Sequence, residues 1–258
     1  MADSVHNTLL LQGLGLLCLL GCGASAAELS DYVTPCKAAD PDLNECVRKA
    51  AQHLLEISSK GIPELNVPQV DPATVPRVAV ERGGGALTLN LEFINSTHHG
   101  LGGTKITKAR IDPYKNEYSF TVIIPHYVVY GQCDISGRII LLPITGHGQG
   151  NLTFIHTEGS WTFRGDRESR DGKTYLKLTT RKVLISNDTP KNMLLHFDGL
   201  FGGNKVLGDR MNRVMNENWK EIFNLLKPSV QASFERRLLP LAQKFLANFP
   251  LKKLFDDL

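Results

Sequence analysis

Residues 208–249 read GDRMNRVMNENWKEIFNLLKPSVQASFERRLLPLAQKFLANF. Apolar side chains recur in this stretch at steps of three, four or slightly more residues, which predicts a long amphipathic helix. An unbroken helix of this length would extend about 60 Å, roughly twice the width of a small domain. A stripe this broad must be covered by the rest of the chain. Its members are Leu207, Met211, Val214, Ile222, Leu226, Val230, Phe234, Leu238, Leu241, Phe245 and Phe249, widened by Met215, Trp219, Phe223, Leu225 and Leu246.

Two prolines, Pro228 and Pro240, lie inside this helical pattern. A proline in a helix interior removes a hydrogen bond and costs about 3 kcal/mol. We therefore expect a kink or break near Leu226–Pro228, which would give two consecutive helical segments.

The chain from Val78 to about Phe197 has the pattern of successive strands. Apolar and polar residues alternate with period two, which indicates strands with one dry and one wet face in an antiparallel sheet. The polar stretch 166–172 predicts a hairpin turn, and the glycines of 146–150 predict another bend. No helical pattern separates the strands, so a doubly wound sheet is excluded. The alternating segments are 87–93, 118–124, 152–156, 161–163 and 176–180.

A shorter amphipathic helix is predicted at Pro41–Lys60, with Asp40 or Asp42 as its cap and Gly61 as its stop. The following segment, 61–76, contains four prolines and predicts an irregular, extended connector. The inner stripe of this helix is Leu43, Cys46, Val47, Ala50, Leu54 and Ile57.

The order of elements, a helix, many strands and a long helix, is that of an α+β fold. The arrangement that covers the long helix is a strongly curved antiparallel sheet wrapped around it. Burial of some fifteen large apolar side chains on that helix would contribute about 20–45 kcal/mol before opposing terms, as an upper bound.

The first residues have the pattern of a secretory signal peptide. The apolar run Leu9–Leu20 is followed by the small residues of 24–26, and it is too short to span a bilayer. One feature is atypical, since no Lys or Arg precedes the run. We expect residues 1–26 to be a signal peptide and 27–258 a single exported domain with no stable membrane insertion.

Three cysteines remain after this leader, and the oxidising compartment favours a disulfide between Cys36 and Cys46. Such a short loop should contribute about 2–3 kcal/mol. Burial of Cys133 as a small apolar side chain is favoured over an intermolecular bridge. Asn95, Asn151 and Asn187 each begin an N-glycosylation sequon, and Pro190 makes the third the weakest.

The motifs of enzymes are absent from the sequence. It has no nucleophile elbow and no H-E-x-x-H, and GHGQG lacks the Lys-Ser/Thr of a phosphate-binding loop. The adjacent histidines His98 and His99 would point apart in a strand or loop, which argues against a metal site. A net charge of +3 with interspersed signs gives no indication of nucleic-acid binding. We expect neither an enzyme nor a cofactor.

The methionines and aromatic residues of the long helix are, taken singly, ordinary core. Taken together they suit a dry internal slot, because methionine adapts to varied apolar partners and apolar ligands require few polar groups.

Several motifs resemble the takeout and juvenile-hormone-binding protein family of insects, over nearly the whole mature chain. They are the segment from Cys36 to Cys46 with the helix after it, GIPEL at 61–65, Asp71-Pro72, GRIILLPITGHG at 137–148, and LFGGNKVLGDRMNRVMNENWKEIFNLLKP at 200–228.

This resemblance implies a long helix wrapped by a curved sheet, an internal hydrophobic tunnel and the Cys36–Cys46 bridge. It also implies carriage of small lipophilic molecules such as terpenoid hormones or fatty acyl compounds, and a link to circadian or feeding regulation. In the hormone-binding branch of this family, the resemblance implies a second disulfide bridge in the body of the sheet. Only Cys133 is available for it here, which places the chain nearer the takeout-like branch and speaks against juvenile hormone itself.

The leading hypothesis is a secreted, monomeric carrier that holds a small hydrophobic ligand in the tunnel. Two alternatives stay open: a secreted modulator that binds a receptor, and a lipid-surface binder of the bactericidal permeability type. The predicted wall residues are Leu54, Ile57, Leu89, Leu91, Phe93, Phe120, Val122, Phe154, Trp161, Phe197, Met211, Met215, Trp219, Phe223 and Leu226.

Overall fold

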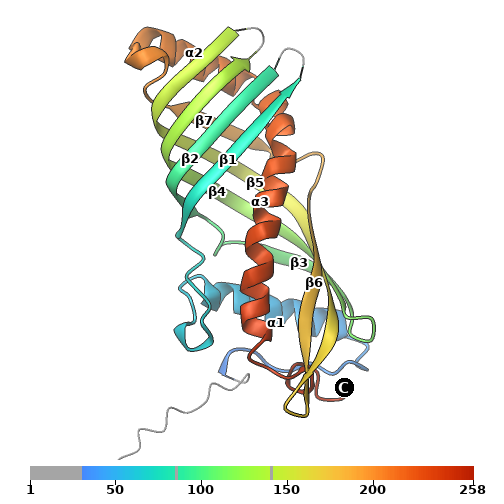
Figure 1. The fold of residues 1–258 in the computed structure, drawn as a ribbon. Coiled ribbons are helices and arrows are strands. Elements are labelled where there is room, and N and C mark those ends of the chain that lie inside the picture. The colour runs from blue at the N-terminus through green and yellow to red at the C-terminus, as the bar shows by residue number, and fades with distance from the viewer. Residues whose placement is uncertain (1–30, 85–86, 140–141) are drawn as a thin grey trace, which may run out of the picture.

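The computed structural model describes residues 31–258 except 85–86 and 140–141. The predicted signal peptide lies outside this range. A curved antiparallel sheet wraps around the C-terminal helices (Figure 1), which confirms the predicted α+β fold. The elements are α1 (Leu43–Ser58), η2 (Pro63–Leu65), β1 (Ala73–Gly84), β2 (Leu87–His99), β3 (Lys105–Asp112), β4 (Glu117–Ile139), β5 (Leu142–Arg170), β6 (Lys173–Ile185), β7 (Asn192–Phe197), η3 (Phe201–Gly203), α2 (Lys205–Glu217), α3 (Trp219–Leu246) and α4 (Leu251–Leu254).

The two longest strands, β4 and β5, form the spine of the sheet. They pair in one register, from Glu117 opposite Arg164 to Ile139 opposite Leu142. At one end of this spine lie β2, β1 and β7, and at the other end lie β3 and β6. The spine is therefore long enough to follow α3 along most of its length (Figure 1).

The inward face of the spine changes parity halfway along. In β4 the buried residues are at even positions up to Ile124 and at odd positions from Tyr127 onward. In β5 the change lies close to His156, which has a positive φ of 54° and stands opposite Pro125 between two paired positions. Because side chains alternate with period two, this local distortion lets both halves of the sheet face the same helix.

The C-terminal helix consists of two segments, but the break is at Asn218 and not near Pro228 as predicted. Asn218 has φ −113° and ψ 27°, and its side-chain Nδ2 donates to the Val214 carbonyl at 2.7 Å. This bond ends α2, and α3 then continues through both prolines. Pro228 and Pro240 are exposed, so the carbonyls that they leave without an N–H partner are close to solvent.

Amide side chains of the helices bond the outer edges of three strands. Asn212 of α2 accepts from the Phe197 N–H and donates to the Phe197 carbonyl, both at 3.0 Å, and Asn216 does the same for Leu195. Gln243 of α3 pairs in this way with β6, and Gln52 of α1 with β3. Among the described residues, no helix side chain bonds the outer edge of β1.

Two predictions about irregular segments were wrong. The GHGQG glycines lie inside β5 and form no bend; glycine is required because Cys133, Phe93 and the Asp198 carbonyl crowd this part of the strand. The connector ends at Pro72, since β1 begins at Ala73 and includes Pro76. An edge strand tolerates proline because it needs fewer N–H donors. The other predicted turn is confirmed at Asp171–Gly172, which joins β5 to β6.

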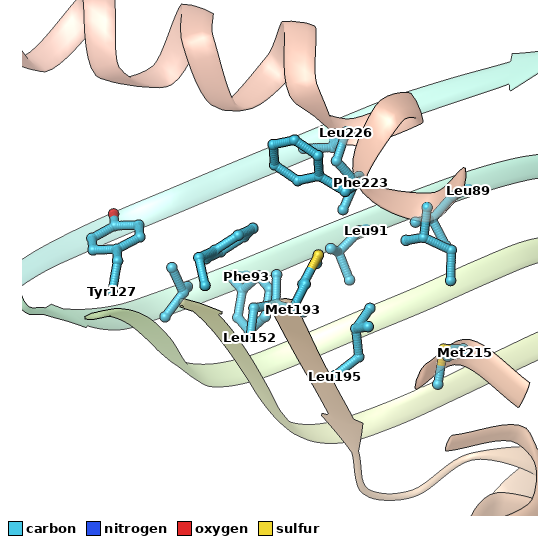
Figure 2. Close-up of a cluster of buried hydrophobic side chains, with 14 of the residues drawn as sticks. Leu89, Leu91, Phe93, Tyr127, Leu152, Met193, Leu195, Met215, Phe223 and Leu226 are labelled. Atoms are coloured by element: carbon cyan, nitrogen blue, oxygen red, sulfur yellow. The ribbon is translucent and has the colours of Figure 1, made fainter. Parts of the chain in front are cut away.

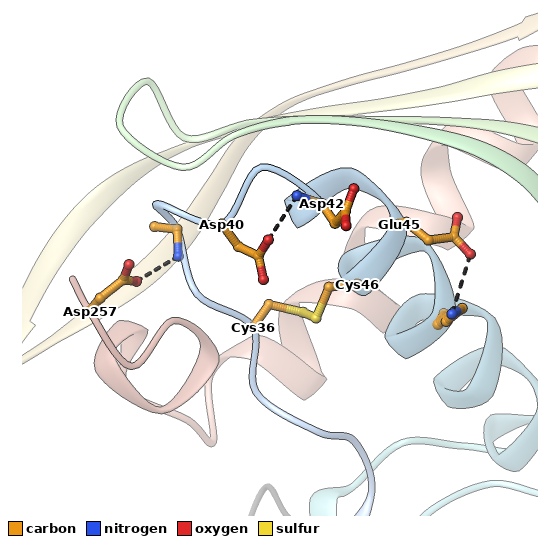
Figure 3. The surroundings of a disulfide bond; sticks show 8 residues. Cys36, Asp40, Asp42, Glu45, Cys46 and Asp257 are labelled. Carbon is orange, nitrogen blue, oxygen red and sulfur yellow. Dashed lines mark hydrogen bonds and ion pairs between the residues drawn. A yellow bond between two sulfur atoms is a disulfide. The ribbon is translucent and has the colours of Figure 1, made fainter.

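A disulfide joins Cys36 to Cys46, as predicted, with 6.0 Å between their Cα atoms. Figure 3 shows that it ties the N-terminal arm to the start of α1 beside the C-terminal residues. The Asp257 carboxylate accepts the backbone N–H groups of Ala39 and Ala38, and these bonds lower its pKa. The two ends of the described chain are therefore held together. Cys133 is free and buried in the core, and burial raises its pKa to about 12.

Candidate functional site

Three apolar hollows lie along α3, between the helix and the inward face of the sheet. We name them after one residue each: the Arg237 hollow, the Trp161 hollow and the Tyr118 hollow. The space between atoms, part of it open to solvent, is about 900 Å³, 440 Å³ and 910 Å³ respectively.

The Arg237 and Trp161 hollows are adjacent. Both are lined by Tyr127 and Phe154 from the spine and by Val230 and Phe234 from α3. The Tyr118 hollow follows along the same helix, because it begins at Ala242, next to the last α3 residue of the Arg237 hollow. The Arg237 and Trp161 hollows thus share one stretch of α3, and the Tyr118 hollow lies further along the same helix.

A chain of buried polar groups lies at the Arg237 hollow. The Tyr127 hydroxyl is 2.6 Å from His98 Nδ1, and His98 Nε2 is 2.9 Å from Ser96 Oγ. Ser96 Oγ in turn donates to the Val75 carbonyl at 3.5 Å. Since that carbonyl can only accept, the consistent assignment has His98 donating to Ser96 and Tyr127 donating to His98.

The two titratable groups of this hydrogen-bonded series, His98 and Tyr127, are neutral at physiological pH. Burial, followed by the nearby charges of Arg237 and His99, lowers the pKa of His98 to about 4. Burial also raises the pKa of Tyr127 above its usual value. Both ring nitrogens of the neutral His98 make a hydrogen bond. The adjacent His99 is exposed. Within the described ranges, no group of three or more potential metal ligands lies together.

Two buried side-chain oxygens have no hydrogen-bond partner in the described part of the chain. They belong to Tyr118, a residue that lines the Tyr118 hollow, and to Thr157, a residue that lines the Trp161 hollow. Burial raises the pKa of Tyr118 to about 12, so its hydroxyl keeps its proton. An unpaired buried hydroxyl costs free energy that a polar atom of a ligand or a water would recover.

The structure brings nine of the predicted wall residues to these hollows and leaves six elsewhere. Ile57 packs in a separate cluster beside η2, and the other five lie in the core or beside it. Figure 2 shows Met215 at the opposite end of the core from Tyr127. The nine are Leu54, Leu91, Phe93, Phe120, Val122, Phe154, Trp161, Phe223 and Leu226. The six are Ile57, Leu89, Phe197, Met211, Met215 and Trp219.

The second half of α3 forms a wall of the Arg237 hollow, although none of its residues was among the predicted wall residues. Val230, Phe234, Leu238 and Leu241 belong to the apolar stripe, but they are only half-buried and line the Arg237 hollow. The available signal was the continuation of the stripe past Pro228. The polar groups His98, Tyr127 and Arg237 carried no recognisable motif, because they come from three separate elements.

The three sequons occupy different surroundings. Asn95 is exposed, has a positive φ of 49° and lies where the β2–β4 register shifts. Asn151 is half-buried in β5 and accepts a bond from the Thr153 hydroxyl at 3.2 Å. Asn187 is exposed and accepts from Lys227 at 3.1 Å. Glycosylation of the three stays a prediction.

No helix within the described residues is both long and apolar enough to cross a membrane.

Two named relatives are similar to this chain over most of its length. The chain is 24% identical to the circadian clock-controlled protein daywake of Drosophila melanogaster over 253 residues, which cover 94% of each chain. It is 23% identical to the protein of that name from Drosophila yakuba, with 87% of this chain and 88% of the other covered.

The crystal structure of takeout 1 from Epiphyas postvittana superposes with a TM-score of 0.78 at 24% identity, and covers 87% of this chain and 100% of that one. Residues 15–256 also match the sequence profile described as "Haemolymph juvenile hormone binding protein (JHBP)". Because that match spans most of the sequence, the chain belongs to the haemolymph juvenile hormone binding protein (JHBP) family.

Proposed function

We propose that this protein is a secreted carrier of a small hydrophobic ligand, which it holds in the hollows along α3. The observation that carries this proposal is the Arg237 hollow, whose walls are apolar except for His98, Tyr127, Ser233 and Arg237. A largely apolar cavity with a few convergent polar groups is typical of a small-molecule site. The family supports the same function, since its description names a hormone-binding haemolymph protein.

The hollows can supply useful affinity without covalent chemistry. A ligand of about 20 heavy atoms that gains roughly 0.3–0.5 kcal/mol per atom would bind with about −6 to −10 kcal/mol. That corresponds to dissociation constants from tens of micromolar to tens of nanomolar. Such a site sequesters its ligand by removing apolar surface from water.

Terpenoids and fatty acyl compounds are the proposed ligand classes, and the relatives named for clock control motivate a rhythmic physiological role. Secretion as a glycosylated monomer, from the predicted leader and sequons, is part of the same proposal.

Native mass spectrometry of the secreted protein, with organic extraction of co-purifying molecules, tests the carrier function. After delipidation, fatty acids, terpenoids and quinones are offered at tens of micromolar. We expect uptake with a stoichiometry of one or two. A protein that takes up none of them would sink the proposal in favour of a receptor-binding modulator, and binding to anionic vesicles without uptake would favour the lipid-surface alternative.

A cavity-filling variant provides the matched control. Val230 lines both the Arg237 and Trp161 hollows, so Val230→Trp should lower ligand uptake. Val206 is 61% exposed at the start of α2, and Val206→Trp should leave uptake unchanged. Equal uptake by the two variants would show that binding occurs elsewhere.

A further inference from the structure

The Arg237 hollow contains one charged side chain that the apolar walls do not explain. Arg237 projects from the half-buried face of α3, among Phe234, Leu238 and Leu241. A positive charge beside apolar walls lacks the stabilisation that an anionic partner would give it. An arginine at this position therefore requires a physical account.

Arg237 has no such partner in the described part of the chain. No carboxylate there lies within 4.0 Å of its guanidinium, and none of the hydrogen bonds found there involves its side chain. The adjacent Arg236, which is exposed, instead donates to Ser233 Oγ at 3.1 Å. Arg237 is thus distinguished from its neighbour by both burial and lack of a partner.

An acidic group near the hollow is Asp71, whose charge adds to burial in raising the pKa of Tyr127. Its carboxylate is engaged elsewhere, because it accepts the N–H groups of Gly100 and Gly102 at 2.8–3.1 Å. His98 offers no negative charge either, because its ring is neutral and the positive charge of Arg237 helps to lower its pKa. Among the lining residues of the hollow, Arg237 is the one that carries a charge at neutral pH.

One positive charge in an apolar hollow selects for one negative charge on the ligand. The guanidinium is planar and presents two parallel N–H donors that match the two oxygens of a carboxylate. A carboxylate also leaves the rest of the molecule free to be apolar, as the remaining walls demand.

We propose that the ligand of the Arg237 hollow is an amphiphile with an ionised carboxylate head, a fatty acid or a terpenoid acid, which pairs with Arg237 while its chain lies along the apolar walls. This inference rests on the carrier function proposed above and narrows it. It predicts discrimination against esters and alcohols of the same chain length, which bury the same apolar surface but carry no charge.

Three probes of equal chain length test the inference: oleate, methyl oleate and oleyl alcohol, each below its aggregation concentration, titrated into delipidated secreted protein at neutral pH. A charge-assisted pair is worth about 1.5–3 kcal/mol, so oleate should bind at least about tenfold more tightly than either neutral probe. Arg237→Gln should reduce that preference to within about threefold, without weakening the binding of methyl oleate.

Two further variants serve as controls. Lys244 is an exposed cation on the same helix outside the hollow, and Lys244→Gln should keep the full preference for oleate. Arg237→Lys retains the positive charge and should keep part of the preference for oleate. This variant also tests the inference if Arg237→Gln fails to fold.

The outcomes separate the two proposals. Equal affinity of the wild-type protein for all three probes would overturn the carboxylate inference and leave the carrier function standing. A preference for oleate that survives Arg237→Gln would also overturn it. If the protein binds none of the three probes and no ligand of the wider panel, the carrier function itself is overturned.

Discussion

The two halves of the C-terminal apolar stripe have the same sequence period but different surroundings. From Met211 to Leu226 the stripe is packed against the sheet, with Met215 and Ile222 each only 1% exposed. From Val230 to Leu241 its members are half-buried and line the Arg237 hollow. Helical periodicity therefore reports which face of a helix turns inward, but it does not report how closely the opposite wall fits that face.

The difference follows from the sheet and not from the helix. The first half meets the regular inward faces of β2, β4, β5 and β7 (Figure 2). Two residues of the second half, Val230 and Phe234, lie beside the region where the spine changes parity, since they line the Trp161 hollow with Ile124 and Thr157. Distorted strands cannot present an even row of side chains, so space remains between the layers.

The largest expected effect compares one residue from each half. Ile222→Ala removes a fully buried side chain that lines no hollow, and should lower the free energy of unfolding by about 3–4 kcal/mol. Leu238→Ala enlarges an existing hollow and should cost about 1 kcal/mol. Urea denaturation of the delipidated proteins measures both values. Equal losses would mean that the second half is packed as tightly as the first.

A pH effect of about 3 kcal/mol is expected from His98 of β2, which lines the same hollow as the second half. Folding lowers the pKa of His98 from 6.5 to about 4, because burial and the charges of Arg237 and His99 disfavour the protonated ring. The unfolded chain therefore binds the proton first. The stability is fully present above pH 6.5 and is lost as the pH falls from 6.5 to 4.

This window can be checked by urea denaturation at successive pH values. His98→Gln should flatten the pH dependence between 6.5 and 4 relative to the wild-type protein, whereas His99→Gln, a change at an exposed neighbour, should not. If the two variants keep the same slope as the wild type, another group is responsible for acid destabilisation.

The smallest of the three effects on stability is expected from Asn212, which belongs to the packed half. Asn212→Ala leaves the N–H and the carbonyl of Phe197 without their side-chain partner, and should cost about 2 kcal/mol. The exposed neighbour Arg213 offers the control, since Arg213→Ala should change stability by less than about 0.5 kcal/mol. Thermal unfolding followed by circular dichroism distinguishes them, and near-equal melting temperatures would show that the amide bonds contribute little.

The sequence was sufficient for the architecture because period-two and helical patterns are local. The spacing of Cys36 and Cys46 in an oxidising compartment predicted the disulfide. The patterns predicted parts of β2, β4, β5 and β6 and the wrapped helix. They misplaced the helix break because Pro228 is tolerated on the exposed side of α3. The bond from the Asn218 side chain to the Val214 carbonyl, which ends α2, has no such simple signature.

The site was less predictable because its polar groups meet only in three dimensions. His98 ends β2, Tyr127 follows the distortion in β4, and Arg237 lies far along α3. Asn212 and Asn216 likewise resemble surface residues of a helix in the sequence, although they bond the edge of β7. Distances between elements, which no periodicity encodes, decide all of these roles.

The outer edge of β1 differs from the other sheet edges because no helix amide pairs with it in the described part of the chain. An open strand edge can template the addition of another polypeptide and so begin aggregation. Here Pro76 gives β1 one N–H donor fewer, and Arg77, which is paired with Glu92, places a charge in the same strand. These residues make β1 a poor template for the addition of another polypeptide.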